Sequence, residues 1–266
     1  MNSPLRPDQL HFSVSQMKQW LMCPRKFSFR YIIGATPEFQ PLPLAFGIAF
    51  HAALAHHYGW LMQGQRSSVD ETKQQFVDSL NKAKADPLPL KFDVDEPFEQ
   101  VQAKGLQMLD VTLTHPSASP AKVLAVEKSF TVDLFDVGSG EVLDEKLTGV
   151  IDLVVEEDNH PVLVEHKTTA RKYSLDQLVF DTQLSGYAFA AEHLGWGDVG
   201  LRFSVTTKTK VPAVQVEDVR RDEFDVAVFL RTAVGVLQAI DKGISFPVRG
   251  WHCRGCPYQA CCSKEH

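Results

Sequence analysis

Charged side chains interrupt two apolar segments near the middle of the chain: Asp152 in GVIDLVV, and Glu165 and Lys167 at the end of PVLVEHKTT. Burying a charge is costly, so such residues need a partner or a function. Two carboxylates brought close together repel unless a cation lies between them, and oxygen ligands suit Mg²⁺ or Mn²⁺. Lys167 could orient a water or stabilise a developing negative charge. The set predicts metal-assisted hydrolysis of a phosphodiester.

Two neighbouring strands are expected to hold these groups. Alternation predicts strands over residues 146–157 and 161–169, and EEDNH between them is a natural hairpin connection, so the strands should be antiparallel. Side-chain alternation places Leu163, Glu165 and Lys167 on one face, and Val162, Val164 and His166 on the other. The alternative is a surface hairpin whose charges form only a weak salt bridge. Companion motifs must decide between the two.

The rest of the chain predicts a mixed α/β core with helices packed on its sheet. A helix should follow Ser13 or Ser15, and Phe27, Phe29 and Tyr31 then alternate beyond Pro24. Further helices are expected over residues 46–62, 70–85, 97–113, 174–194 and 220–243. Further strands are expected over residues 123–135 and, once or twice, within 201–219.

Composition limits the class of protein. The chain has 266 residues, 44% of them hydrophobic, which suits one substantial core. A net charge of -6 argues against nonspecific coating of nucleic acid, although a local basic groove remains compatible with it. No apolar run reaches the roughly 18 residues of a membrane span, and the start lacks a secretory signal. A cytoplasmic location is therefore expected, where clustered cysteines favour metal or redox chemistry over disulfides.

Four motifs occur together in an informative order. They are G-x-x-x-H from Gly47 to His51, G-x-x-D from Gly149 to Asp152, E-x-K from Glu165 to Lys167, and Q-x-x-x-Y from Gln183 to Tyr187. Together they resemble the PD-(D/E)XK nuclease superfamily, specifically its RecB-like branch. The resemblance implies a restriction-endonuclease-like fold, a mixed sheet core flanked by helices. It also implies one nuclease domain over residues 1–266, with a helical part at about 13–115, a core at about 120–242, and a C-terminal segment at 243–266.

The resemblance assigns roles to individual residues. It implies that His51, Asp152, Glu165 and the backbone carbonyl of His166 bind the catalytic metal. It implies that Gln183 and Tyr187, on one helix face, border the active site and contact DNA or position the phosphate. Glu127 matches an acidic position of this branch and is expected to be an auxiliary active-site residue. Gly47 would let its helix approach the sheet closely. By residue type alone, His51 and Tyr187 could equally be ordinary packing residues.

The C-terminal segment HCRGCPYQACC offers three spaced thiols, Cys253, Cys256 and Cys262, where a tetrahedral site needs four. The one cysteine outside this segment is Cys23, which lies 230 positions before Cys253. This pattern resembles the iron-sulfur segment of AddB-type and CRISPR-associated adaptation nucleases. It implies a structural [4Fe-4S] cluster on these four cysteines, joining the two ends of the chain. Zn²⁺ is the alternative occupant, and Cys261 is a spare thiol that could replace Cys262.

DNA contacts are predicted at basic side chains on separate segments. Those named are Arg25, Lys26 and Arg30 around Cys23, and Lys208 and Lys210, which would share one strand face. Trp20, Phe27 or Tyr31 could stack on single-stranded bases. The alternative for each group is a solvated surface.

The function predicted is a Mg²⁺- or Mn²⁺-dependent DNA exonuclease that acts on single-stranded ends in DNA repair, recombination or processing. The alternatives are a CRISPR adaptation nuclease that trims prespacers with partners, a non-catalytic iron-sulfur DNA-binding module, and a redox sensor. The chain has no G-x-x-x-x-G-K-[ST] phosphate loop, so a helicase partner would have to supply any unwinding.

Overall fold

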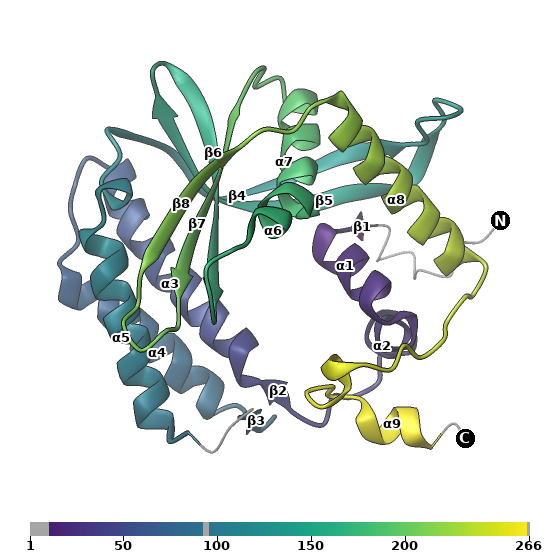
Figure 1. The fold of residues 1–266 in the computed structure, drawn as a ribbon, viewed down its shortest axis with the longest axis horizontal. Coiled ribbons are helices and arrows are strands. Elements are labelled where there is room, and N and C mark those ends of the chain that lie inside the picture. The colour runs from purple at the N-terminus through teal and green to yellow at the C-terminus, as the bar shows by residue number, and fades with distance from the viewer. Residues whose placement is uncertain (1–10, 93–95, 265–266) are drawn as a thin grey trace.

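The computed structural model describes residues 11–92 and 96–264. Its helices pack around a six-stranded mixed sheet (Figure 1), and β2 (Gln40–Pro41) and β3 (Leu90–Lys91) form a separate two-stranded sheet. The strands of the six-stranded sheet are β1 (His11–Phe12), β4 (Lys122–Phe135), β5 (Val142–Glu157), β6 (His160–Thr169), β7 (Gly200–Thr207) and β8 (Val214–Val219). The α-helices are α1 (Val14–Met22), α2 (Pro24–Phe27), α3 (Leu42–Met62), α4 (Val69–Lys84), α5 (Phe98–Thr114), α6 (Leu175–Phe180), α7 (Thr182–His193), α8 (Glu223–Asp241) and α9 (Gln259–Ser263). A π-helix (Ser28–Ile33) and 3₁₀ turns (Pro116–Ala118 and Trp251–Cys253) complete the list.

The large sheet has the order β1-β5-β6-β7-β8, with β4 paired to β5 as well. β4, β5 and β6 are consecutive antiparallel strands, and β6 and β7 are parallel, joined through α6 and α7. β8 returns antiparallel to β7. This mixed sheet with helices on both faces is the predicted α/β fold, which the structure confirms.

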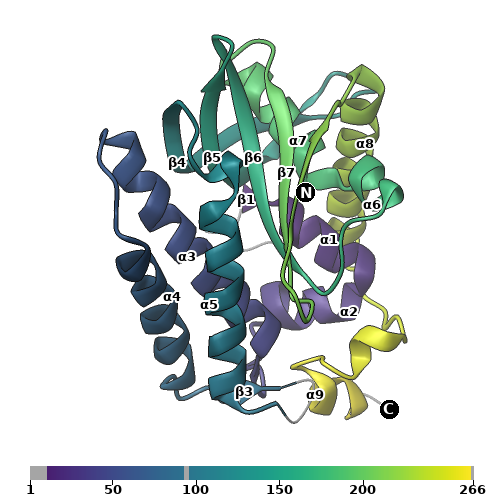
Figure 2. The same ribbon diagram turned by 60° about the vertical axis from the view of Figure 1, so that its left-hand side comes forward.

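Each face of the sheet carries its own apolar core. Helices α1, α7 and α8 cover one face, and α3, α4 and α5 cover the other (Figures 1 and 2). Leu163 packs in the first core, whereas Val162 and Val164 pack in the second, so β6 is buried on both sides as its nearly continuous apolar sequence requires. This alternation confirms the two predicted faces of β6.

Two different strands, β1 and β6, pair with separate stretches of one edge of β5. The gap between these stretches is where the candidate site opens. β4 pairs with β5 over most of its length. On the other edge, β6 pairs from Leu153 onwards, whereas β1 pairs only with Lys146 and Leu147. The backbone between these two stretches therefore lacks a neighbouring strand. One side-chain contact satisfies part of it, because the Tyr187 hydroxyl lies 2.7 Å from the Val150 carbonyl. At the same place the Asp152 side chain reaches β6, where its Oδ2 accepts from the His166 N–H at 2.8 Å.

The hairpin between β5 and β6 is a tight turn, as EEDNH predicts. Asp158 and Asn159 both have positive φ, 50° and 63°, as the two central residues of a type I′ turn do. The turn pairs Glu157 with His160 and fixes the register that follows. Because of that register, Asp152 and Glu165 both lie where β6 begins to leave β5.

Two local predictions were wrong. Residues 174–194 form two helices, because Asp181 ends α6 and its side chain then caps α7 by accepting from the Gln183 N–H at 2.7 Å. The alternating aromatic residues after Pro24 lie in α2 and the π-helix, within the part expected to be helical. Lys208 and Lys210 lie in the loop between β7 and β8, because β7 ends at Thr207.

The C-terminal segment returns to the N-terminal helices, beside α2 in both views (Figures 1 and 2). The Arg25 N–H donates to the Phe246 carbonyl at 3.1 Å, and the Glu38 N–H donates to the Pro257 carbonyl at 2.8 Å. The Phe29 ring stacks on Tyr258 with centroids 5.9 Å apart. These contacts place the segment that carries the terminal cysteines next to Cys23.

Within residues 11–92 and 96–264, no helix combines the length and the apolarity that crossing a membrane requires.

Candidate active site

His51, Glu127 and Asp152 form a compact group of ligand atoms contributed by α3, β4 and β5. One ligand atom from each lies within 4.8 Å of the other two. His51 Nδ1 is 3.2 Å from Asp152 Oδ1, and the other Asp152 oxygen accepts from the His166 N–H. One imidazole and two carboxylates are a ligand set that suits a divalent cation such as Mn²⁺ or Mg²⁺. Among the described residues, this is the one cluster of three His, Cys, Asp or Glu side chains that meets this distance.

Glu127 reaches this group through an unusual backbone conformation. Its φ is 49°, although it lies inside β4, between residues paired to Leu153 and Ile151 of β5. Residues other than glycine rarely adopt positive φ, and its cost persists only where the surroundings impose it. This conformation interrupts the alternation of side-chain direction along β4 at the position opposite Asp152. There the Glu127 carboxylate lies next to His51 and Asp152.

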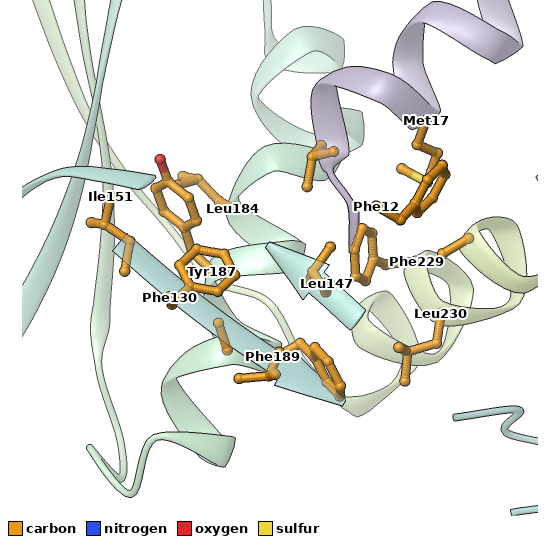
Figure 3. Packing of buried hydrophobic residues seen from close by; sticks show 14 of the residues in the cluster. Phe12, Met17, Phe130, Leu147, Ile151, Leu184, Tyr187, Phe189, Phe229 and Leu230 are labelled. Carbon is orange, nitrogen blue, oxygen red and sulfur yellow. The ribbon is translucent and has the colours of Figure 1, made fainter. Parts of the chain in front are cut away.

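Glu165 and Lys167 lie together on β6, as their spacing predicts. Lys167 Nζ forms a close ion pair with Glu165 Oε1, and the Tyr187 hydroxyl from α7 is 2.5 Å from Glu165 Oε2. Tyr187 is packed edge-on against Phe130 at the rim of the apolar core (Figure 3). The Glu165 carboxylate is thus held from two sides in a buried position, with both oxygens engaged.

The pKa directions reflect crowding of negative charge. Burial, and then the charge of Asp152, raise the pKa of Glu127. Burial also raises the pKa of Glu165, assisted by Asp152 and opposed by Lys167. For Asp152, burial favours a higher pKa, but the hydrogen bond and charge of His51 outweigh it and lower the pKa. A cation among these carboxylates would relieve their repulsion, which is the electrostatic condition of a metal site.

A cavity of about 350 Å³ opens beside these groups. Its lining includes Ser13, Ser15, Phe130, Thr148, Gly149, Asp152, Glu165, Lys167, Gln183 and Tyr187. The cavity therefore occupies the part of the β5 edge that neither β1 nor β6 covers. The charged groups of the G-x-x-D and E-x-K motifs face this cavity together with both named residues of Q-x-x-x-Y.

The glycines of two motifs have different surroundings. A Cβ on Gly149 would lie 2.5 Å from the Phe130 ring, so only glycine fits there without displacement. A Cβ on Gly47 would meet nothing within 4 Å. The expectation that Gly47 permits a close approach of its helix to the sheet is therefore wrong.

The structure distributes the predicted metal ligands differently from the expected set. His51 and Asp152 lie together, but Glu127 completes their group, whereas Glu165 is engaged by Lys167 and Tyr187. The His166 imidazole is buried on the opposite face of β6, stacked on Tyr58 with centroids 5.5 Å apart, and burial lowers its pKa to about 4. His166 touches the site through its backbone N–H.

The predicted DNA-binding residues fall into two places. Arg25, Lys26 and Arg30 lie on α2 and the π-helix, near the C-terminal segment. Lys208 lies over the Phe46 ring at 4.0 Å, while Lys210 accepts from Lys104 through its carbonyl. Phe27 is buried and cannot stack on a base. Trp251, which the sequence interpretation overlooked, is 82% exposed.

The cysteines gather at the junction of the two chain ends. Burial raises the pKa of the Cys256 thiol, and the nearby thiols of Cys23 and Cys253 contribute to the increase. Cys261 and Cys262 lie in α9, whose Ala260 N–H donates to Glu38 at 2.7 Å. Thiols are donors that suit either an iron-sulfur cluster or zinc. Among the described residues, no three of these cysteines have sulfur atoms within 4.8 Å of one another.

Lys18 and Asp181 are residues near the site that the sequence interpretation missed. Lys18 Nζ on α1 is 2.8 Å from Asp181 Oδ1, at the start of α7. Asp181 carried a readable signal, because an Asp before Thr-Gln inside a long helical pattern is typical of an N-cap. Lys18 carried none, because its neighbour is 163 positions away in the chain.

Comparison with known proteins gives the family. A model of the PD-(D/E)XK nuclease superfamily matches residues 11–263. The chain superposes on the crystal structure of a predicted exonuclease from Eubacterium rectale with a TM-score of 0.58 and 12% identity, over 94% of this chain and 88% of that one. The crystal structure of SSO0001 gives a TM-score of 0.47 and 12% identity, over 97% and 88% of the chains. No curated protein matches by sequence. The family match, over nearly all of the chain, shows that this protein belongs to the PD-(D/E)XK nuclease superfamily.

Proposed function

We propose that this nuclease is a DNA exonuclease that requires Mg²⁺ or Mn²⁺ and acts on single-stranded ends. One observation carries the proposal: His51, Glu127 and Asp152 converge beside the Glu165–Lys167 pair at one opening in the sheet. Exonuclease activity has a precedent in the name of the Eubacterium rectale protein of similar fold. The whole chain is proposed to act as one nuclease domain.

His51, Glu127 and Asp152 are the residues proposed to hold the divalent cation, with Glu165 and the His166 carbonyl as the further ligands expected from the family. When bound, the cation supplies Lewis acidity toward a phosphate and lowers the pKa of a water. Because Lys167 is held by the buried Glu165 carboxylate, its ammonium is fixed at the cavity and stays protonated; its pKa is raised, since the partner carboxylate outweighs burial. It can therefore orient a nucleophile and neutralise charge on the phosphate.

Tyr187 and Gln183 are proposed to complete the frame of the site. The Tyr187 hydroxyl lies 2.7 Å from the Val150 carbonyl and 2.5 Å from Glu165 Oε2, and its single proton serves these two acceptors, so it links β5 to β6. Its pKa is raised, mainly by burial and by the charge of Glu165, so it stays protonated and acts as a donor. Gln183, one helical turn earlier, also lines the cavity, and its side chain hydrogen-bonds Tyr187.

The substrate is proposed to be single-stranded DNA, held by basic side chains and by exposed aromatic rings. Trp251 is available for base stacking, and Lys208, Lys210, Arg25, Lys26 and Arg30 are proposed to contact phosphates. Cys23, Cys253, Cys256 and Cys262 are proposed to bind a structural [4Fe-4S] cluster, which agrees with a reducing, cytoplasmic setting. DNA repair, recombination or prespacer trimming with CRISPR or helicase partners are the processes that such an enzyme would serve.

The test is digestion of single-stranded and duplex DNA labelled at either end, with anaerobically purified protein and added Mg²⁺ or Mn²⁺. The wild-type chain should shorten single strands from an end, and chelator should stop it. Lys167→Ala should abolish cleavage while the protein still folds and binds DNA. DNA left intact by the wild-type chain with both metals would reject the nuclease proposal and favour the non-catalytic DNA-binding module.

A further inference from the structure

Lys18 brings a second ammonium group to the edge of the active site. It lies on α1, whose first residues, Ser13 and Ser15, line the cavity. Its Nζ is 2.8 Å from Asp181 Oδ1, and Asp181 caps the helix that carries Gln183 and Tyr187. The ammonium is thus anchored between two elements that both contribute residues to the cavity lining, and its side chain keeps 38% of its surface exposed.

The surrounding charges set Lys18 apart from an ordinary surface ion pair. Burial, and then the charge of Lys167, act to lower its pKa, whereas Asp181 and Glu165 act to raise it, and the net direction is downward. Lys18 therefore lies within electrostatic range of both members of the E-x-K pair. Each ammonium already has one carboxylate partner, Asp181 for Lys18 and Glu165 for Lys167, and a phosphate between the two would further reduce their mutual repulsion.

Hydrogen-bonding capacity leads to the same point. An ammonium has three N–H donors, and Asp181 takes one of those on Lys18. Lys167 is already committed to Glu165. The pair is partly buried, because the Asp181 side chain keeps only 15% of its surface exposed. Burial disfavours the charge on Lys18, and a phosphate at the cavity would use the two donors that Asp181 leaves.

We propose that Lys18 binds a backbone phosphate of the DNA strand next to the phosphate that is hydrolysed, while Asp181 holds its ammonium in position. The inference rests on the proposed nuclease function and extends it to a substrate subsite on α1. Lys18 is a substrate-binding residue in this account, and Lys167 keeps its role at the reacting phosphate.

The experiment measures binding of a fluorescent single-stranded oligonucleotide in EDTA, where no cleavage occurs, over a series of salt concentrations. Lys18→Met should weaken binding several-fold and reduce the slope of log K against log salt by about 0.7, the value for one lost phosphate contact on a single strand. Asp181→Asn should keep the slope, because the amide oxygen still caps α7 and accepts from Lys18. In cleavage with Mn²⁺, Lys18→Met should raise KM far more than it lowers kcat.

Lys73→Met is the matched control, because Lys73 forms an ion pair with Asp110 on the α4–α5 surface. It should leave the slope unchanged. Lys18→Gln, which can still donate to Asp181, is a second neutral variant in case Lys18→Met does not fold. An unchanged slope in a folded neutral variant overturns the proposal. Equal losses in Lys18→Met and Asp181→Asn, with no further loss in the double variant, would also overturn it in favour of a purely structural pair. Absence of both binding and cleavage in the wild-type chain would instead contradict the proposed function.

Discussion

At the scale of single residues, the site combines groups that are unfavourable without a ligand. Glu127 occupies a backbone conformation that few side chains adopt, and it points a carboxylate at the more acidic Asp152. Partial burial of the carboxyl group and the charge of Asp152 raise its pKa, while His51 acts in the opposite direction. We expect metal binding to offset the cost of the backbone conformation and of the crowded charges.

Glu127→Gln tests this account through thermal stability. In EDTA the variant should melt at or above the wild-type temperature, because the repulsion with Asp152 is gone. Added Mn²⁺ should raise the wild-type Tm in a concentration-dependent manner, and the variant should need about 10- to 100-fold more metal for the same shift. Differential scanning fluorimetry across a Mn²⁺ series provides the measurement. Glu141→Gln, in the exposed β4–β5 turn, is the control and should respond as the wild type does.

Lys208 is a second residue whose charge is disfavoured by its surroundings. Burial lowers its pKa from 10.5 to about 8, and the Phe46 ring at 4.0 Å offsets only part of that cost. Below about pH 8 the lysine is charged in the folded and unfolded chain alike, so the folded state carries the desolvation cost. Between the two pKa values the folded chain has already lost the proton, so stability rises with pH.

Lys208→Met should therefore raise the free energy of unfolding by about 1–2 kcal/mol at pH 7, after the favourable ring contact is subtracted from the pKa cost. The advantage should shrink as pH rises from about 8 toward 10.5. Urea unfolding at several pH values measures it, with Lys210→Met, an exposed lysine two positions on, as the control. If Lys208 contacts DNA as proposed, the same variant should bind a single strand more weakly. A variant less stable than the wild type at pH 7 would contradict the assignment.

At the scale of elements, replacing each of the two motif glycines by alanine is expected to have opposite effects on stability. Gly149→Ala would place a methyl group 2.5 Å from the Phe130 ring in β5, and should destabilise the protein by about 1–3 kcal/mol. Gly47→Ala lies inside α3 with open space around it, and should stabilise the helix by about 0.5–1 kcal/mol. Urea unfolding of both variants provides the comparison. Rescue of Gly149→Ala by Phe130→Leu would assign the loss to that contact, whereas equal effects of the two alanines would refute it.

The sequence was most informative where a local pattern determines structure. The β5–β6 hairpin follows from EEDNH and the two faces of β6 follow from alternation, so the meeting of Asp152 with Glu165 could be predicted. The positive φ of Glu127 could not, because glutamate does not favour it and only contacts across the sheet select it. The division of α6 from α7 at Asp181 was also missed, since apolar periodicity continues across the break. Contacts between distant segments, such as Lys18 with Asp181, leave no local pattern to read.

At the scale of the whole molecule, the C-terminal segment is held against α2 and the loop that follows the π-helix, beside the nuclease core. The C-terminal segment contacts α2, the loop after the π-helix and β3, the last through Lys91 Nζ and the Arg254 carbonyl at 3.1 Å. Only Cys23, which is extended, separates α1 from α2, and the first residues of α1 line the active-site cavity. Anything that fastens the terminal segment to Cys23 therefore also restrains the helix that forms one wall of the cavity.

A metal centre on Cys23, Cys253, Cys256 and Cys262 would close a loop of about 230 residues. The loop-closure relation gives about 5 kcal/mol for a covalent link of that length, an upper guide for a link through a cluster. Loss of one ligand should therefore lower the Tm by several degrees and increase disorder at the α1 wall. Cys23→Ser and Cys253→Ser should behave alike, although the residues lie at opposite ends of the chain, because each removes the same link.

The measurement is the colour, iron, sulfide and zinc content, and Tm of each serine variant after anaerobic purification. The wild-type chain and Cys261→Ser should be brown and equally stable, whereas the four ligand variants should be colourless and melt earlier. If the wild-type protein is colourless and contains zinc, the four cysteines bind Zn²⁺ instead of an iron-sulfur cluster. The link between Cys23 and the C-terminal segment would remain. If Cys23→Ser alone retained both the metal and the wild-type Tm, the C-terminal cysteines would bind the metal without Cys23. The restraint on α1 would then come from the hydrogen bonds around Glu38 and Phe246.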